Sequence, residues 1–85
     1  MSNTNDRFQL AIKKISESKV HLSNDQKLDL YKYFKQGTIG NCNGEEPYFF
    51  ELKAHAKWKA WSSIKGMNKE QALLNYISLV DIIVK

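Results

Sequence analysis

The sequence predicts an all-α fold in a single domain spanning residues 1–85. Three observations favour helices. Apolar residues recur at three- and four-residue spacing, helix-capping residues stand before those segments, and no segment alternates apolar and polar residues as a half-buried strand does. The contents of 42% hydrophobic and 26% charged residues are close to those of globular domains, so we expect a folded helical core.

The first predicted helix covers about residues 6–18, with Asn5 or Asp6 as its N-cap. Its apolar side chains fall on one stripe, which contains Phe8, Ala11, Ile12 and Ile15. The second predicted helix opens at Ser23, where Gln26 completes a capping box, because each side chain can accept the free backbone N–H of the other residue.

A long loop over residues 40–52 follows the second helix. Gly40, Asn43, Gly44 and Pro47 favour or impose non-helical backbone angles there. The apolar side chains at the end of this loop are expected to anchor it onto the core: Tyr48, Phe49, Phe50 and Leu52.

The third helix is expected over about residues 53–65, where Gly66 provides a C-terminal signal. The fourth helix starts at Asn68, with Gln71 in the capping-box position. Its apolar stripe contains Leu73, Tyr76, Ile77, Val80 and Val84. Aromatic residues at helical spacing usually pack inside, so the expected core also includes Phe34, Trp58 and Trp61.

Thirteen Lys and Arg against nine Asp and Glu give a net charge of +4. This excess suits an anionic ligand with a few phosphates but is too small to indicate nucleic acid. No apolar run approaches the roughly 18 residues of a membrane span, and residues 1–6 are polar, unlike a signal peptide. Cys42 is the only cysteine, so no intramolecular disulfide can form and a reducing compartment, the cytoplasm, is expected.

Two pairs of residues can carry ligand chemistry. Tyr31 and Lys35 are four residues apart on the second helix, and Lys53 and Lys57 are four apart on the third, so each pair shares a helix face. Such residues can clamp a polyphosphate or form an ordinary solvated face, and the spacing leaves both interpretations open. Tyr31 and Tyr76 are the better aromatic ligand candidates, because a tyrosine at a stripe edge can keep its hydroxyl in a cleft.

Catalytic and metal sites are weakly supported. His21, His55 and Cys42 are too few and too scattered for a zinc site. A nucleophilic pair of Cys42 and His55 stays open, although no orienting group or oxyanion site is identifiable. A glycine-rich nucleotide-binding fingerprint is missing as well. We expect neither enzyme activity nor a metal or cofactor.

Two sequence blocks carry a resemblance to a known family. Residues 31–43, YKYFKQGTIGNCN, resemble the pattern YxxYKQATxGDxN of the acyl-CoA-binding protein family. Residues 53–80, KAHAKWKAWSSIKGMNKEQALLNYISLV, resemble its pattern KxKAKWDAWxxLKGMSKEEAMxxYIxLV. The blocks stand in the family's order and at its spacing. With Phe8 and Pro47, the resemblance covers roughly residues 8–84.

The resemblance implies a four-helix up-down-down-up bundle with a long loop between the second and third helices. It implies non-catalytic binding, transport and buffering of medium- to long-chain fatty acyl-CoA, by a monomer that meets acyl-CoA-using enzymes transiently, without nucleic acid or stable membrane insertion. The family's CoA head-group positions correspond to Tyr31, Lys35, Lys53, Lys57, Tyr76 and Ser16. Its acyl groove corresponds to Phe8, Ile12, Leu28 and Phe34.

Three departures from the family pattern bear on affinity and chain-length preference. Ser16 stands where many members carry a head-group lysine, Phe34 replaces a tyrosine, and Glu46 precedes Pro47 where arginine is frequent. Alternative interpretations of the chain are a small basic helical module that binds nucleic acid, a helical protein-interaction domain, and a thioesterase that acts through Cys42.

Overall fold

The computed structural model describes residues 3–85. Met1 and Ser2, the first residues of the predicted domain and of the polar N-terminus, lie outside the described residues. The chain forms α1 (Thr4–Glu17), α2 (Asn24–Thr38), α3 (Leu52–Ser62) and α4 (Lys69–Ile83), with no strand within residues 3–85. The predicted all-α class is confirmed.

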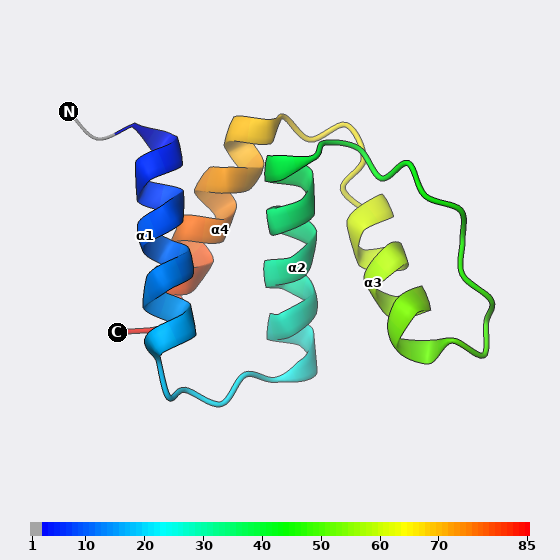
Figure 1. Cartoon of the computed structure of the whole chain (residues 1–85), viewed down its shortest axis with the longest axis horizontal. Helices are drawn as coiled ribbons and strands as arrows, with labels where there is room; N and C mark the ends of the chain where they lie inside the picture. Colours follow the sequence, from blue (N-terminus) through cyan, green and yellow to red (C-terminus); the bar gives the residue numbers. More distant parts are fainter. Residues whose placement is uncertain (1–2) are drawn as a thin grey trace.

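The four helices run in the predicted up-down-down-up order, in which α2 and α3 are parallel and α1 and α4 run the other way (Figure 1). In space α4 packs against both α1 and α2, whereas α3 packs against α2 alone among the described helices. The molecule is therefore long and flat, with principal extents of 42 × 28 × 15 Å. The loop over residues 39–51 and α3 form one end of the long axis (Figure 1).

The main core lies among α1, α2 and α4. Its buried residues are Phe8, Ala11, Leu30, Tyr76, Ile77 and Val80. Only Trp61 of α3 is fully buried, and Trp58 is half-buried. Phe34, predicted to be a core residue, is 38% exposed because only part of its ring packs on Phe8 and Tyr76. The third helix is thus attached to the bundle rather than part of its centre.

The helix starts follow their caps. The capping box of Ser23 and Gln26 is confirmed, with both reciprocal hydrogen bonds present. The predicted cap of the first helix is wrong, because the Asn3 side chain accepts from the Asp6 N–H at 2.8 Å and the helix begins at Thr4. The start of α4 is capped by its asparagine as predicted, since Asn68 accepts from the N–H groups of the second and third residues of the helix.

Two further helix predictions need correction. The box at the start of α4 is only half formed, because the Gln71 side chain donates to Asn75 at 2.8 Å instead of reaching back to the cap. The third helix ends at Ser62, three residues before the predicted end at Lys65, and turns carry the chain on to Gly66. Gly66 has φ of 95°, a left-handed conformation that suits glycine.

A buried polar cluster ties the end of α2 to both neighbouring connections. Gln36 is 1% exposed, and its Nε2 donates to Asn41 Oδ1 at 2.9 Å and to the Met67 carbonyl at 2.8 Å. Asn41 Oδ1 also accepts from the Gly66 N–H at 2.7 Å. One side chain of α2 thereby fixes where the loop leaves the helix and where the α3–α4 turn returns.

Replacing this glutamine is expected to destabilise the fold. Gln36→Ala leaves the Met67 carbonyl without its donor and opens a small cavity, so we expect a loss of about 2–3 kcal/mol in the free energy of unfolding. Gln71→Ala is the matched control, because Gln71 is exposed and its change should stay within about 0.5 kcal/mol. Urea denaturation measures both, and equal midpoints for the two variants would contradict the role of the cluster.

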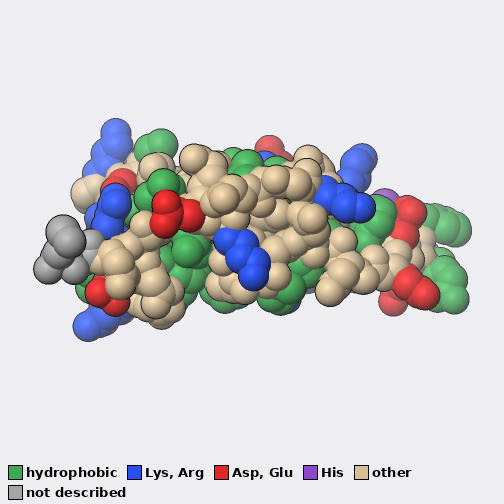
Figure 2. Space-filling view, turned by 90° about the horizontal axis from the view of Figure 1, so that it is seen from above, with side chains coloured by type: hydrophobic (Ala, Val, Ile, Leu, Met, Phe, Trp, Pro, Cys, Tyr) green, Lys and Arg blue, Asp and Glu red, His purple; other side chains and the backbone are tan. Residues whose placement is uncertain are grey.

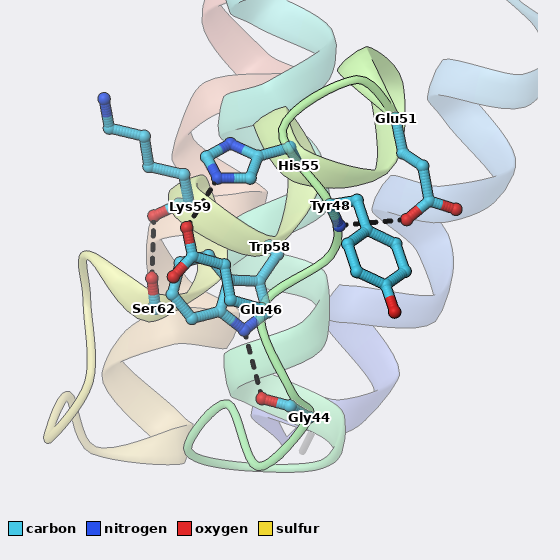
Figure 3. Close-up of polar contacts among 8 residues, drawn as sticks. All are labelled: Gly44, Glu46, Tyr48, Glu51, His55, Trp58, Lys59 and Ser62. Atoms are coloured by element: carbon cyan, nitrogen blue, oxygen red, sulfur yellow. Dashed lines mark hydrogen bonds and ion pairs between the residues drawn. The ribbon is translucent and has the colours of Figure 1, made fainter.

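The prediction that the loop's apolar residues anchor it onto the core is wrong. Tyr48, Phe49, Phe50 and Leu52 are all exposed. Polar contacts hold the loop against α3 instead (Figure 3): Trp58 Nε1 donates to the Gly44 carbonyl at 3.1 Å, and His55 Nε2 lies 2.7 Å from Glu46 Oε2. Within the loop's end, the Tyr48 N–H donates to Glu51 Oε2 at 3.0 Å. These bonds turn the loop toward α3 and leave its aromatic rings facing outward.

Candidate ligand-binding site

Two lysines from different helices meet over one tyrosine ring. Lys35 Nζ of α2 lies 5.9 Å from the centroid of the Tyr31 ring, and Lys57 Nζ of α3 lies 5.5 Å from the same centroid. The Lys35 ammonium also lies 5.4 Å from the ring of Trp61. Because α2 and α3 run parallel and pack directly, residues 22 positions and more apart in the chain converge at this point. The two cations therefore lie on the same side of the molecule.

Tyr31 keeps its proton at neutral pH. Partial burial raises the pKa of Tyr31 above its ordinary value, and the Coulombic interaction with Cys42 raises that pKa further. The phenol therefore stays neutral and can donate a hydrogen bond, while the ammonium groups beside it carry positive charge. A donor and two cations facing the same space suit a phosphorylated group.

An open cleft of about 450 Å³ adjoins this cluster, and we call it the aromatic cleft. It lies between α2, α3 and the loop that connects them. Its walls are Tyr31, Cys42, Gly44, Pro47, Lys53, Ala54, Lys57, Trp58 and Trp61. Trp61 is held in position by its Nε1, which donates to the Gly40 carbonyl at 2.8 Å. Flat aromatic walls with lysines at the rim can stack a ring system and bind its phosphates at once.

A second open cleft, of about 490 Å³, lies farther along the same groove between α2 and α3, and we call it the apolar cleft. It is lined by Asn24, Lys27, Leu28, Leu52, Lys53, Ala56 and Lys57. Lys53 and Lys57 line both clefts, so the two clefts adjoin at these residues. Leu28, Leu52 and Ala56 are the apolar residues of the second cleft, and its three lysines can add their aliphatic stems to the same wall while their ammonium groups stay at the rim.

The structure brings together some of the predicted residues and separates others. Tyr31, Lys53, Lys57 and Leu28 line the clefts, and Lys35 lies beside the Tyr31 ring. Ser16 lies on α1, exposed, where its hydroxyl donates to the Lys13 carbonyl at 2.9 Å. Because α1 packs on α4 and α3 packs on α2, this serine stands apart from the cluster.

The predicted groove residues on α1 do not form a wall of either cleft. Phe8 is 1% exposed, and its ring packs edge-on against Tyr76 at a centroid distance of 5.0 Å, so it belongs to the core. Tyr76 itself is 6% exposed, and burial raises its pKa. Ile12 is half-buried against the core. Phe34 lies between these aromatic rings and the surface, 6.3 Å from Tyr76, and is the most accessible of the four.

The sequence interpretation missed several cleft residues. Lys27 and Ala56 line the apolar cleft although neither was singled out, and Leu52 lines it after being assigned to the core. Lys27 stands four residues before Tyr31, and Lys35 stands four residues after it. The helical spacing that placed Lys35 on the face of Tyr31 therefore places Lys27 on that face as well. Nothing local in the sequence marks Ala56, whose small side chain matters only because α2 faces it.

Catalytic and metal interpretations gain no support from the geometry. The His55 ring bonds Glu46 across the loop, so it serves a structural contact there. Within residues 3–85 no group of three or more His, Cys, Asp or Glu side chains is arranged to hold a metal ion. None of the helices in that range has the length and apolar character that a bilayer crossing requires.

The fold and the two clefts define a class of protein: a small four-helix bundle with a binding groove that is lined by lysines and aromatic residues. Comparisons with known proteins narrow this class. The family described as "Acyl CoA binding protein" matches residues 5–80. The chain therefore belongs to the acyl-CoA-binding protein family, as the two sequence blocks predicted.

Individual relatives agree with this assignment. The chain is 42% identical over 74 residues to an acyl-CoA-binding protein of Dictyostelium discoideum, covering 87% of this chain and 88% of the relative. It is 39% identical over 74 residues to that of Saccharomyces cerevisiae, covering 87% and 85%. The crystal structure of Oryza sativa acyl-CoA-binding protein 2 superimposes with a TM-score of 0.89 at 33% identity, covering 95% of this chain and 90% of that one.

Proposed function

We propose that this protein binds medium- to long-chain fatty acyl-CoA esters without reacting them, and so buffers and transports them. The observation that carries this proposal is the meeting of Lys35 and Lys57 over Tyr31 beside an apolar cleft. A fatty acyl-CoA joins an anionic phosphorylated head to a hydrocarbon tail, and the groove between α2 and α3 offers a compartment for each. Family membership supports the same ligand.

The head group is assigned to the aromatic cleft and its rim. Lys35 and Lys57 bind phosphate oxygens, the Tyr31 hydroxyl donates to the same group, and Lys53 adds a third cation where the two clefts join. Each charge-assisted hydrogen bond contributes about 1.5–3 kcal/mol. These contacts distinguish a CoA ester from a free fatty acid, which lacks the phosphates.

The tail is assigned to the apolar cleft. Leu28 on α2 faces Leu52 and Ala56 on α3 across it. Burying one methylene contributes about 0.8 kcal/mol, so a chain with ten shielded methylenes gains roughly 8 kcal/mol before ordering costs. The tail and the head group therefore contribute free energies of the same order, while the phosphates supply the selectivity for CoA esters.

Four of the family-derived positions make no direct contact with the ligand in this proposal. Phe8, Ile12 and Tyr76 support the aromatic packing beneath Phe34 and do not reach the clefts without rearrangement. Ser16 contributes no head-group contact from its place on α1. We further propose that the protein acts as a cytoplasmic monomer, passes its ligand transiently to acyl-CoA-using enzymes, and needs no cofactor.

One titration tests both binding and the absence of catalysis. Palmitoyl-CoA, kept below the concentration at which it forms micelles, should bind in a saturable one-to-one reaction by calorimetry and should release no CoA thiol on prolonged incubation. Cys42 lines the aromatic cleft, so Cys42→Ser is the informative variant and should bind as the unmodified protein does. Release of CoA thiol that depends on Cys42 would indicate a thioesterase instead of a carrier. An absence of saturable binding would refute the proposal.

A further inference from the structure

Four apolar side chains at the end of the α2–α3 loop face solvent. We call them the aromatic tip: Tyr48, Phe49, Phe50 and Leu52, with exposed fractions of 71%, 83%, 67% and 77%. Large apolar residues gathered in one exposed patch differ from the single exposed leucines of an ordinary surface, and such patches mark contact sites. No packing requirement of the bundle accounts for them, since the core lies among α1, α2 and α4.

The rings of the aromatic tip pack on one another. Tyr48 and Phe50 stack with centroids 5.4 Å apart and an interplanar angle of 4°, and Phe49 meets Phe50 edge-on at 5.7 Å. The Glu51 carboxylate accepts from the Tyr48 N–H, which fixes the turn that presents them (Figure 3). The tip is therefore an organised surface rather than a set of independent side chains.

Carboxylates surround the aromatic tip. Glu45, Glu46 and Glu51 flank it in the chain and are exposed; Glu46 contacts His55 and Glu51 accepts from the Tyr48 N–H, and hydrophobic and acidic side chains gather together at this end of the molecule in Figure 2. Aromatic faces attract quaternary ammonium groups, and carboxylates complement their charge. An apolar tip with this rim suits a surface that presents choline groups above hydrocarbon.

The aromatic tip is continuous with the apolar cleft. Leu52 belongs to both, and Lys53, the next residue, lines both clefts. Pro47, which precedes the tip, lines the aromatic cleft. A hydrocarbon chain that leaves a bilayer at the tip could thus reach the apolar cleft over Leu52, past the neighbouring Lys53.

We propose that the aromatic tip is a peripheral docking surface for zwitterionic, phosphatidylcholine-rich bilayers, through which acyl-CoA enters the apolar cleft. The contact inserts side chains at the interface and no helix crosses the bilayer. Tyrosine favours this interfacial zone, where its apolar ring and its polar hydroxyl are both accommodated, and phenylalanine and leucine bury their apolar side chains at its acyl boundary. The docking itself is independent of the proposed function, whereas the transfer of acyl-CoA rests on it.

Vesicle flotation tests the docking. The full chain should float with phosphatidylcholine vesicles at both low and 0.5 M salt, and the double variant Phe49→Ser/Phe50→Ser should lose about tenfold or more in partition coefficient, because the two most central rings are removed. Leu10→Ser is the matched control: Leu10 is 64% exposed on α1, at the other end of the molecule, and its loss should leave flotation unchanged.

Several outcomes would overturn this proposal. The first is an absence of flotation with phosphatidylcholine vesicles, and the second is equal flotation of the double variant and the unmodified chain. The third is binding that is confined to anionic vesicles and abolished by salt, which would assign the contact to the lysines. A dimer in solution that the double variant converts to monomer would assign the tip to a second copy of the chain.

A separate measurement distinguishes this inference from the proposed function. The double variant should bind micelle-free palmitoyl-CoA as tightly as the unmodified chain by calorimetry, while it extracts palmitoyl-CoA from phosphatidylcholine vesicles at least tenfold more slowly. Loss of solution binding in the unmodified chain would refute the carrier. Normal solution binding with equal extraction rates would refute only the role of the tip.

Discussion

Lengthening the acyl chain by four methylenes is expected to tighten binding of acyl-CoA about two-hundredfold, until the apolar cleft is full. Each methylene that enters a cleft lined by Leu28, Leu52 and Ala56 leaves water, and about 0.8 kcal/mol per group corresponds to roughly a fourfold change in affinity. Calorimetry with butyryl-, octanoyl-, dodecanoyl- and palmitoyl-CoA gives the series.

The variant Leu28→Asn provides the contrast for this series. It places an amide in the wall of the apolar cleft, so the gain per methylene should shrink while short-chain esters, which do not reach the wall, bind as before. Free fatty acids of the same lengths should bind much more weakly than the esters at every length. A series that stays flat from four to sixteen carbons would exclude the apolar cleft as the site of the tail.

Lys57→Ala is expected to weaken acyl-CoA binding ten- to hundredfold, in line with the loss of one charge-assisted hydrogen bond of about 1.5–3 kcal/mol. Lys35→Ala should have an effect of similar size, because both ammonium groups approach the same Tyr31 ring. Removing Lys35 should weaken short- and long-chain esters by the same factor, since Lys35 does not line the apolar cleft, whereas Lys57 lines both clefts and its loss also alters the wall around the tail. Calorimetry with octanoyl- and palmitoyl-CoA measures both factors.

Lys59→Ala is the control for these variants. Lys59 is an exposed lysine on the same helix as Lys57, only two residues away, but it lines neither cleft. It changes the net charge by the same amount, so any general electrostatic effect appears in all three variants. Equal affinity of Lys57→Ala and Lys59→Ala would mean that the position of the charge is irrelevant, which contradicts the head-group assignment.

Much of the fold could be predicted from the sequence because its signals are local. The box of Ser23 and Gln26 and the asparagine at 68 fixed two helix starts, since a side chain three residues from its backbone partner needs no tertiary context. The first helix began earlier than predicted because Asn3, Asn5 and Asp6 are all competent caps and the choice among them depends on where the helix packs. The order of the helices followed from the family resemblance, not from periodicity.

The sequence predicted the site residues that lie in the groove between α2 and α3. It did not predict which apolar side chains are buried in the core and which are accessible to a ligand. Tyr31 and Phe8 are both aromatic residues on helical stripes, yet one lines a cleft and the other lies at the centre of the core. The loop aromatics show the reverse error, because hydrophobic character suggested burial for Phe49, which is exposed. Sequence specifies which side chains are apolar, but the packing of helices decides which of them meet water.

The attachment of α3 to α2 alone has a consequence for ligand exchange. Separating α3 breaks a single helix–helix interface and leaves the core among α1, α2 and α4 intact, so the groove can open by sub-global breathing at a fraction of the cost of unfolding. The cluster around Gln36 anchors the two chain segments that lead to and from α3. Any movement of α3 away from α2 is therefore limited by these two anchored segments. The strength of one interface, rather than the stability of the whole bundle, then governs how long a cargo molecule resides.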